Sequence, residues 1–322
     1  MRYLVGTDEA GYGPNLGPLV VAASVWEMPA GLQAEDLAQI LDGVIAPAIP
    51  PCGDPRLAMA DSKQLYKPGG TLAPIERTVQ AVLAAIELSS STWRELWPLL
   101  CPAANEPVAE VPAWEADYDQ PLPCDVPAGE ISQAAEWLAR GLAARQVRLT
   151  QLAATRLHAR SFNDLCDHCG NKAEVLSLAT LQLAKRAISV LPPAADVLVL
   201  CDRHGGRMRY APLLQSVFDE GRVQVVLETK EQAVYELLGD GPPVEFRFTV
   251  KGERYLPTAL ASMTAKYARE LSMRAFNAFW QRHVPALRAT AGYPVDARRF
   301  ADQIRPVQAS LGIDDRDLWR SR

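Results

Sequence analysis

Two apolar segments near the start of the chain are joined by a run of residues that cannot form regular secondary structure. Residues 2–7 and 19–26 are rich in β-branched and other apolar side chains, which is typical of buried strands. Between them, residues 11–18 form the run Gly-Tyr-Gly-Pro-Asn-Leu-Gly-Pro. Its glycines and prolines interrupt both helix and strand. The sequence therefore predicts two strands joined by a long turn, with Asp8 and Glu9 where the first strand enters the turn.

The rest of the chain alternates between strand-like and helix-like patterns. Residues 173–190 predict a helix, because alanine, leucine and lysine dominate until two prolines stop it. Residues 196–201, Asp-Val-Leu-Val-Leu-Cys, predict a central strand. Further elements are expected as helices over 72–88 and, in one or two pieces, 255–280, and as strands over 86–92, 146–157, 223–227 and 244–250. This order indicates an α/β fold with a sheet of mixed direction.

Acidic side chains lie at the expected ends of two strands. Asp8 ends the first strand, and Asp202 follows the strand at 196–201. Ligand sites in α/β sheets lie at the carboxyl ends of strands, so the two carboxylates converge if these strands are neighbours. Clustered carboxylates repel one another unless they are protonated or bind a cation, and oxygen ligands favour Mg²⁺ or Mn²⁺. The four candidate metal ligands are Asp8, Glu9, Asp202 and Glu253.

The formal net charge of −5 argues against a nucleic-acid partner, but the charge is unevenly distributed. Residues 95–137 contain nine acidic residues, seven prolines and no Lys or Arg. We expect one domain over 1–322 with an acidic, loop-rich, proline-rich insertion near 95–139 and a helical C-terminal part from about 255. Residues 247–305 contain eleven Lys or Arg against four acids, which indicates either a phosphate-binding face or a solvated helical surface.

Several short motifs occur in a fixed order between residues 6 and 270. They are Gly-Thr-Asp-Glu-Ala-Gly-Tyr-Gly from position 6, Asp-Ser-Lys-Gln-Leu from 61, Val-Leu-Cys-Asp from 199, Lys-Gly-Glu from 251, and Ala-Ser-Met-Thr-Ala-Lys from 261, followed by Arg269-Glu270. Together they resemble the signature of the type 2 ribonuclease H (ribonuclease HII) family, of which this chain looks like a divergent member.

The resemblance implies a ribonuclease H-like fold, with a mixed five-stranded sheet flanked by helices and a helical C-terminal part. It implies endonucleolytic hydrolysis of RNA in RNA–DNA hybrids, or of ribonucleotides embedded in duplex DNA, by a two-metal mechanism with Mg²⁺ or Mn²⁺. The carboxylates that it assigns to catalysis and metal binding are Asp8, Glu9, Asp202 and Glu253.

The resemblance also assigns contacts with the substrate. Backbone groups of Gly11, Tyr12 and Gly13 would face the ribose 2′-hydroxyl, the group that distinguishes RNA from DNA, unless the glycines only form the turn. Tyr293 could stack on a sugar or serve as a packing tyrosine. The candidate phosphate contacts, which could also be plain surface lysines, are Lys63, Lys251 and Lys266.

A few positions depart from the family pattern. Tyr12 stands where the family has Arg or Lys, which removes a cation. Glu253 and Glu270 stand where Asp is expected, and a carboxylate misplaced by about 1 Å can cost roughly a hundredfold in rate. Glu270 is a possible accessory residue. So is His204, which is either a proton shuttle or an exposed loop histidine.

Three functions are consistent with this sequence. The first is the metal-dependent endonuclease that the resemblance implies. The second is a nucleic-acid-binding protein that keeps the ribonuclease H-like fold with weakened catalysis. The third is a metal-dependent phosphoesterase for a small substrate, which would bind nucleic acid weakly and without salt dependence.

Two further expectations concern location and cysteines. No apolar run approaches the roughly 20 residues that span a bilayer, and the early acids leave no room for a signal peptide. We therefore expect a soluble, cytoplasmic protein with no membrane partner. Cys166 and Cys169 have the spacing of half a zinc site, but no second pair completes it, so they are either ordinary reduced cysteines or zinc ligands.

Overall fold

The computed structural model describes residues 1–67, 69–101 and 111–321. Seven strands form the main sheet: β1 Arg2–Ala10, β2 Leu19–Met28, β5 Arg148–Leu157, β6 Asp196–Asp202, β7 Arg222–Glu228, β8 Gln232–Leu238 and β9 Val244–Thr249. Their order across the sheet is β5-β2-β1-β6-β9-β8-β7. A separate two-stranded sheet pairs β3 Ile45–Ala46 with β4 Leu57–Ala58.

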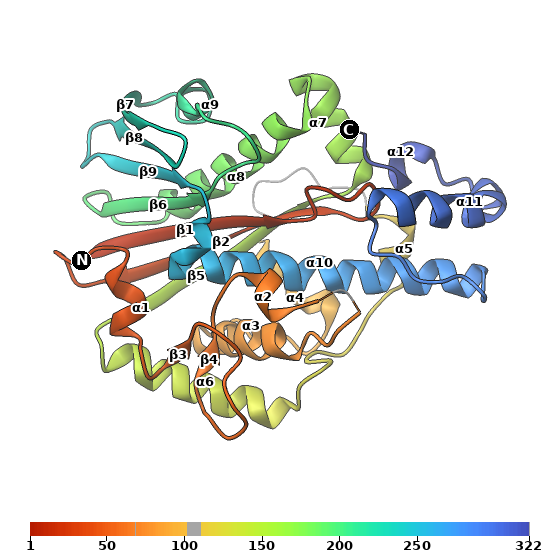
Figure 1. Cartoon of the computed structure of the whole chain (residues 1–322), viewed down its shortest axis with the longest axis horizontal. Helices are drawn as coiled ribbons and strands as arrows, with labels where there is room; N and C mark the ends of the chain where they lie inside the picture. Colours follow the sequence, from red (N-terminus) through yellow and green to blue (C-terminus); the bar gives the residue numbers. More distant parts are fainter. Residues whose placement is uncertain (68, 102–110, 322) are drawn as a thin grey trace.

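Helices cover both faces of the main sheet (Figure 1). They are α1 Asp36–Ile40, α2 Ser62–Leu65, α3 Ala73–Ala85, α4 Trp93–Leu100, α5 Ala113–Ala116, α6 Ala128–Ala143, α7 Ala159–Cys169, α8 Lys172–Ser189, α9 Ala211–Val217, a 3-10 helix Gly252–Arg254, α10 Leu256–His283, α11 Pro294–Ser310 and α12 Asp315–Leu318. Helix α8 packs on β1 and β2 from one side, and α10 packs on the same strands from the other, with α3 and α6 beyond it.

The α/β class, the mixed sheet and the helical C-terminal part are confirmed. The sheet has seven strands where five were expected, because the β8–β7 hairpin extends it beyond β9. The strand expected over 86–92 is wrong. Helix α3 ends at Ala85, and Glu87 adopts a φ of 63°, so the chain turns there instead of extending. The region expected as one or two helices over 255–280 is the single helix α10.

Strand alternation divides the core into two layers. Leu4 packs with Leu260 of α10 in one layer, and the next residue, Val5, packs with Leu181 of α8 in the other. Helix α10 approaches β1 very closely at Gly6, where a Cβ atom would lie 2.1 Å from the carbonyl carbon of Pro257. Only a glycine allows this contact, which fixes the start of α10 against the central strand.

The direction of the central strands brings two acids together. Strand β1 is antiparallel to β2 and parallel to β6. Thr7 is the register partner of Cys201, so the next residues, Asp8 and Asp202, lie at the same edge of the sheet. Strands β1 and β6 are therefore neighbours in the sheet, as expected.

The acidic insertion expected near residues 95–139, hereafter the acidic segment, is largely helical in the part that the structure describes, where mainly loops were expected. It contributes α4, α5 and most of α6, while residues 102–110 lie outside the described residues. Trp93, which opens α4, and Trp114 of α5 are buried. Arg156 of β5 lies over the Trp97 ring at 4.1 Å, and this contact attaches α4 to the sheet.

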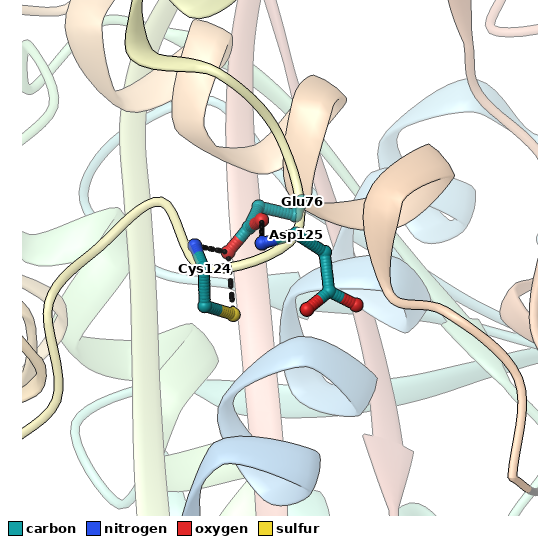
Figure 2. A group of neighbouring side chains, drawn as sticks. All are labelled: Glu76, Cys124 and Asp125. Atoms are coloured by element: carbon teal, nitrogen blue, oxygen red, sulfur yellow. Dashed lines mark hydrogen bonds between the residues drawn. The ribbon is translucent and has the colours of Figure 1, made fainter.

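A buried glutamate fastens the segment to α3 (Figure 2). Glu76 accepts hydrogen bonds from the N–H groups of Cys124 at 2.8 Å and Asp125 at 2.5 Å, and from the Cys124 thiol at 3.0 Å. The Tyr267 hydroxyl donates to the same carboxylate at 2.7 Å. Glu76, Cys124 and Asp125 are close enough to hold a metal ion. However, the donors directed at Glu76 already satisfy its oxygens. The three residues therefore serve to attach the acidic segment to α3.

None of the described helices is long and apolar enough to cross a membrane. Cys166 and Cys169 both lie on α7 as free cysteines. Neither belongs to a group of potential metal ligands among the described residues.

Candidate functional site

Three carboxylates converge at the edge of the sheet where β1 and β6 end. Asp8 lies near the end of β1, Asp202 is the last residue of β6, and Glu253 lies in the short turn before α10. One oxygen from each lies within 4.8 Å of the others. Two oxygens bound to one divalent cation lie at most about 4–5 Å apart, because each metal–oxygen bond measures roughly 2.0–2.6 Å. This acidic group is therefore spaced to share a cation, and its oxygen-only chemistry fits Mg²⁺ or Mn²⁺.

The turn that carries Glu253 is built around a glycine. The Gly252 N–H donates to Asp202 Oδ1 at 2.8 Å. A Cβ atom on Gly252 would lie 2.8 Å from the Asp202 Cα, so a larger residue would push the turn away from β6. Lys251, just before it, has a φ of 59° in the left-handed region. This close approach of two backbones places Glu253 beside Asp202.

Burial and mutual repulsion make the acidic group costly without a cation. Burial raises the pKa of Asp8 well above its usual range, and the neighbouring Glu9 carboxylate raises it further, while a hydrogen bond with Ser262 opposes the shift. Burial likewise raises the pKa of Glu9 to about 7. Glu9 does not belong to the group of three converging carboxylates, but it is the neighbour of Asp8 in the chain. The pKa values of Asp202 and Glu253 are also raised, mainly by burial. A bound cation would remove this repulsion.

We expect these shifts to make both stability and metal binding depend on pH. Between pH 4.5 and about 7, the folded metal-free chain binds more protons at Glu9 than the unfolded chain, so its stability falls as pH rises. Metal ions compete with those protons, so Mn²⁺ should raise the melting temperature more at about pH 8 than at about pH 6. Thermal scans with and without Mn²⁺ check this, with NaCl of equal ionic strength as the control. An equal Mn²⁺ effect at both pH values would contradict it.

A cavity of about 880 Å³ opens beside the acidic group. Asp202 and Glu253 line it together with Lys63 and Lys251. Lys63 Nζ lies 3.6 Å from Glu253 Oε1, while the Lys63 side chain is 80% exposed. The structure thus brings two of the three candidate lysines to the acidic group and keeps Lys63 accessible to solvent.

Lys266 and Glu270 contact each other instead of the acidic group. Lys266 Nζ lies 2.6 Å from Glu270 Oε1 and 4.6 Å from the centre of the Tyr66 ring. The Tyr66 hydroxyl donates to the other Glu270 oxygen at 3.0 Å. These contacts join α10 to the end of α2, and they occupy both side chains.

His204 is a buried residue, which corrects the expectation of an exposed loop histidine. It is 2% exposed, and its Nδ1 lies 3.0 Å from the Ser177 hydroxyl. Its ring packs edge-on against Tyr210 and Phe248. Burial lowers the pKa of His204 to about 3, so the imidazole is neutral at physiological pH. Its contacts are those of a core side chain.

The glycine-rich turn, residues 11–18, directly follows β1, the strand that carries Asp8 and Glu9. Gly11 has a φ of 92°, and a Cβ atom there would lie 2.5 Å from the Pro18 carbonyl oxygen, so the turn requires glycine at this position. Gly13 is exposed. A Cβ atom on Gly13 would lie 3.8 Å from the Tyr293 ring, which is the nearest side chain. Tyr293 is 52% exposed, so the two residues form a continuous open surface.

Tyr12 connects the turn to α8. Lys172 Nζ, in the first turn of α8, lies 4.7 Å from the centre of the Tyr12 ring. Burial raises the pKa of Tyr12, and the nearby Glu9 carboxylate raises it further. Lys172 thus places a cation near the position where the family pattern has a basic side chain.

Sequence reasoning missed two residues that shape this site. Ser262 contacts Asp8 from α10, and its position inside a conspicuous motif was a usable signal. Arg320 lies beneath the glycine-rich turn and contacts Gly11 and Pro14. Nothing in the local sequence around Arg320 indicates a contact with a turn at the other end of the chain.

The fold and the acidic group together define an α/β protein with an oxygen-rich site at the ends of adjacent parallel strands. Solved structures match nearly the whole chain. A PCNA–ribonuclease HII complex from Archaeoglobus fulgidus matches at 15% identity over 99% of this chain and 94% of that chain, with a TM-score of 0.45. Ribonuclease H2 from Pyrococcus horikoshii OT3 matches at 13% identity over 98% and 92%, with a TM-score of 0.48.

A third match is Bst ribonuclease HIII in complex with Mn²⁺, at 16% identity over 99% of this chain and 66% of that chain, with a TM-score of 0.48. No family model matches the chain, and no curated protein matches it. The similarity to these structures concerns the fold alone.

Proposed function

We propose that this protein is a divalent-metal-dependent endonuclease that hydrolyses RNA in RNA–DNA hybrids or at ribonucleotides embedded in duplex DNA. The observation that carries the proposal is the convergence of Asp8, Asp202 and Glu253 within 4.8 Å at the ends of adjacent parallel strands. A group of like charges of which one is buried and two are partly buried is best explained by a cation that they share. The motifs around these acids favour a phosphodiester of nucleic acid as the substrate.

Each residue of the site has a defined task under this proposal. Asp8, Asp202 and Glu253 would hold the metal, with Glu9 beside them as a fourth carboxylate. Bound divalent ions activate a water molecule and stabilise the leaving oxygen of a phosphodiester. Lys63, at the mouth of the cavity, would attract the substrate phosphate and compensate its charge.

The surface formed by Gly13 and Tyr293 supports recognition of a ribonucleotide. An exposed glycine lets a backbone approach a sugar closely, and the ribose 2′-hydroxyl can both donate and accept hydrogen bonds. The half-exposed Tyr293 ring is adjacent and would pack against that sugar.

Two other functions have one observation each in their favour. The pairing of Lys266 with Glu270 removes a cation from the candidate phosphate contacts, which favours a catalytically weakened nucleic-acid-binding protein. A cavity of about 880 Å³ is large enough for a small phosphate ester, which favours a small-substrate phosphoesterase. Salt-sensitive binding of duplexes would argue against the second of these.

The direct test uses two duplexes that differ in one nucleotide. We expect the protein with Mg²⁺ or Mn²⁺ to cut a DNA duplex containing a single ribonucleotide, to leave the matched all-DNA duplex intact, and to stop cutting when EDTA is added. Product length on a denaturing gel locates the cut. Tight, salt-sensitive binding without cutting would select the weakened binding protein. Absence of both cutting and binding would overturn the proposal.

A further inference from the structure

The segment that follows α12 packs against the glycine-rich turn. The Arg320 N–H donates to the Asn15 carbonyl at 2.9 Å, and the Asn15 side-chain amide donates to the Arg320 carbonyl at 3.2 Å. On the other side, Asn163 of α7 holds the same segment, donating to the Trp319 carbonyl at 2.8 Å and accepting from the Ser321 N–H at 2.6 Å. Residues 319–321 are thus fixed between α7 and the turn.

The Arg320 side chain lies directly beneath the turn. It is 1% exposed, and its Nη2 donates to the carbonyl oxygens of both Gly11 and Pro14. In the chain, these two carbonyls lie on either side of half-buried Tyr12 and exposed Gly13. The Arg320 guanidinium carbon also lies over the Phe162 ring, 4.9 Å from its centre, and this cation–π contact stabilises the side chain in place.

A second buried guanidinium supports the same turn. Arg269 of α10 is 2% exposed, and its Nη2 donates to the Ala291 carbonyl at 3.0 Å. Its side chain fills the space that a Cβ atom on Gly11 would need. Nε of Arg269 and both Nε and Nη1 of Arg320 have no hydrogen-bond partner among the described residues. Arg269 Nη1 lies 3.5 Å from Glu270 Oε1, whereas Arg320 has no acidic partner among the described residues. Burying an uncompensated charge with unpaired donors is expensive, so packing alone does not account for an arginine at position 320.

The orientation of one peptide group connects Arg320 to the exposed surface. In a trans peptide the C=O and the following N–H point in opposite directions. Because the Gly11 carbonyl is turned inward onto Arg320, the Tyr12 N–H is turned to the other side of the turn. Without the guanidinium, the Gly11–Tyr12 peptide would lose the partner that holds its orientation.

We propose that Arg320 is a positioning residue that orients the Gly11–Tyr12 peptide so that the Tyr12 N–H faces the 2′-hydroxyl oxygen of a ribonucleotide in the substrate. This inference rests on the proposed endonuclease function and extends its site to a residue near the other end of the chain. Arg320 itself touches neither substrate nor metal. It determines whether the turn distinguishes a ribonucleotide from a deoxyribonucleotide.

The test measures discrimination separately from metal binding. Dissociation constants are determined, with Ca²⁺ in place of Mn²⁺ to avoid cutting, for a duplex with one ribonucleotide and for the matched all-DNA duplex. We expect the wild type to prefer the ribonucleotide duplex, and Arg320→Gln to reduce that preference about tenfold, a cost typical of leaving a polar contact misaligned. Binding of all-DNA duplex and the Mn²⁺-induced rise in melting temperature should be unchanged.

Two further variants make the result decisive. Arg305→Gln removes one positive charge from the exposed face of α11 and should leave the preference intact. If Arg320→Gln does not fold, Arg320→Lys keeps the charge with a single ammonium group and should fold with a severalfold smaller preference than the wild type. A folded Arg320 variant with full preference would overturn this inference alone. A wild type with no preference would overturn the proposed function, and this inference with it.

Discussion

Replacing Asp8 with Asn should abolish metal-dependent cutting and, at the same time, stabilise the metal-free protein. The substitution replaces one of three carboxylates that converge within 4.8 Å by a neutral amide, so the metal loses one negatively charged ligand and is held less tightly. A bound metal contributes several kcal/mol to such a reaction, which corresponds to a rate loss of about a hundredfold or more. It also removes a buried charge whose pKa is raised by burial and by Glu9, so the free energy of unfolding without metal should rise by about 1–2 kcal/mol.

The opposite signs of these two effects distinguish a metal site from a structural acid. Initial cutting rates and melting temperatures, each with EDTA and with Mn²⁺, are measured for wild type and variant. Asp42→Asn is the matched control, because Asp42 lines the same cavity but lies outside the acidic group. Cutting at the wild-type rate by Asp8→Asn would rule out Asp8 as a metal ligand. A fall in the melting temperature of the metal-free variant would show that repulsion between Asp8 and the neighbouring carboxylates does not destabilise the metal-free protein.

Replacing Glu76 with Ala should lower the free energy of unfolding by about 3–5 kcal/mol, because each buried donor left without an acceptor costs about 1–3 kcal/mol. Glu76 is fully buried and accepts from the N–H groups of Cys124 and Asp125. It also accepts from the Tyr267 hydroxyl on α10. An alanine leaves these donors without an acceptor and opens a cavity, so the acidic segment loses its attachment to α3.

Urea unfolding followed by tryptophan fluorescence measures this effect, since several tryptophans lie in or beside the acidic segment. Glu130→Ala, an exposed acid in the first turn of α6, is the matched control and should change the free energy of unfolding by less than about 0.5 kcal/mol. A loss below about 1 kcal/mol for Glu76→Ala would mean that the hydrogen bonds around Glu76 contribute little to stability.

The central part of the fold could be predicted because local pattern and global position agree there. The apolar segment ending in Asp8 and the one ending before Asp202 are buried on both faces, so continuous hydrophobicity identifies each as a central strand. Two acids at the ends of such strands are adjacent once the strands pair in parallel. The short Lys-Gly-Glu motif then supplies Glu253, whose place depends on the close backbone contact that Gly252 allows.

The expectations from the sequence fail at residues whose burial or pairing is determined by tertiary contacts. His204 stands among arginines and glycines, a local composition typical of an exposed loop, yet its ring fills a space between Tyr210 and Phe248. Strand β8 was not anticipated because its alternation includes a glutamate and only two of its seven residues are fully buried. The contact between Arg320 and Gly11 joins opposite ends of the chain, so no sequence window contains both residues.

The pairing of β1 with β6 has a consequence for how the chain reaches its folded state. Strand β1 is synthesised well before its parallel neighbour β6 and the helix that covers it, α10, because both come far later in the chain. Contacts between such distant segments slow folding, because the intervening chain must be ordered before they can form. A nascent chain that has not yet reached β6 therefore presents an unpaired edge of β1. Asp8, Asp202 and Glu253 lie on segments that are far apart in the chain, so their carboxylates meet only when those segments have packed together, and the same packing offsets their repulsion.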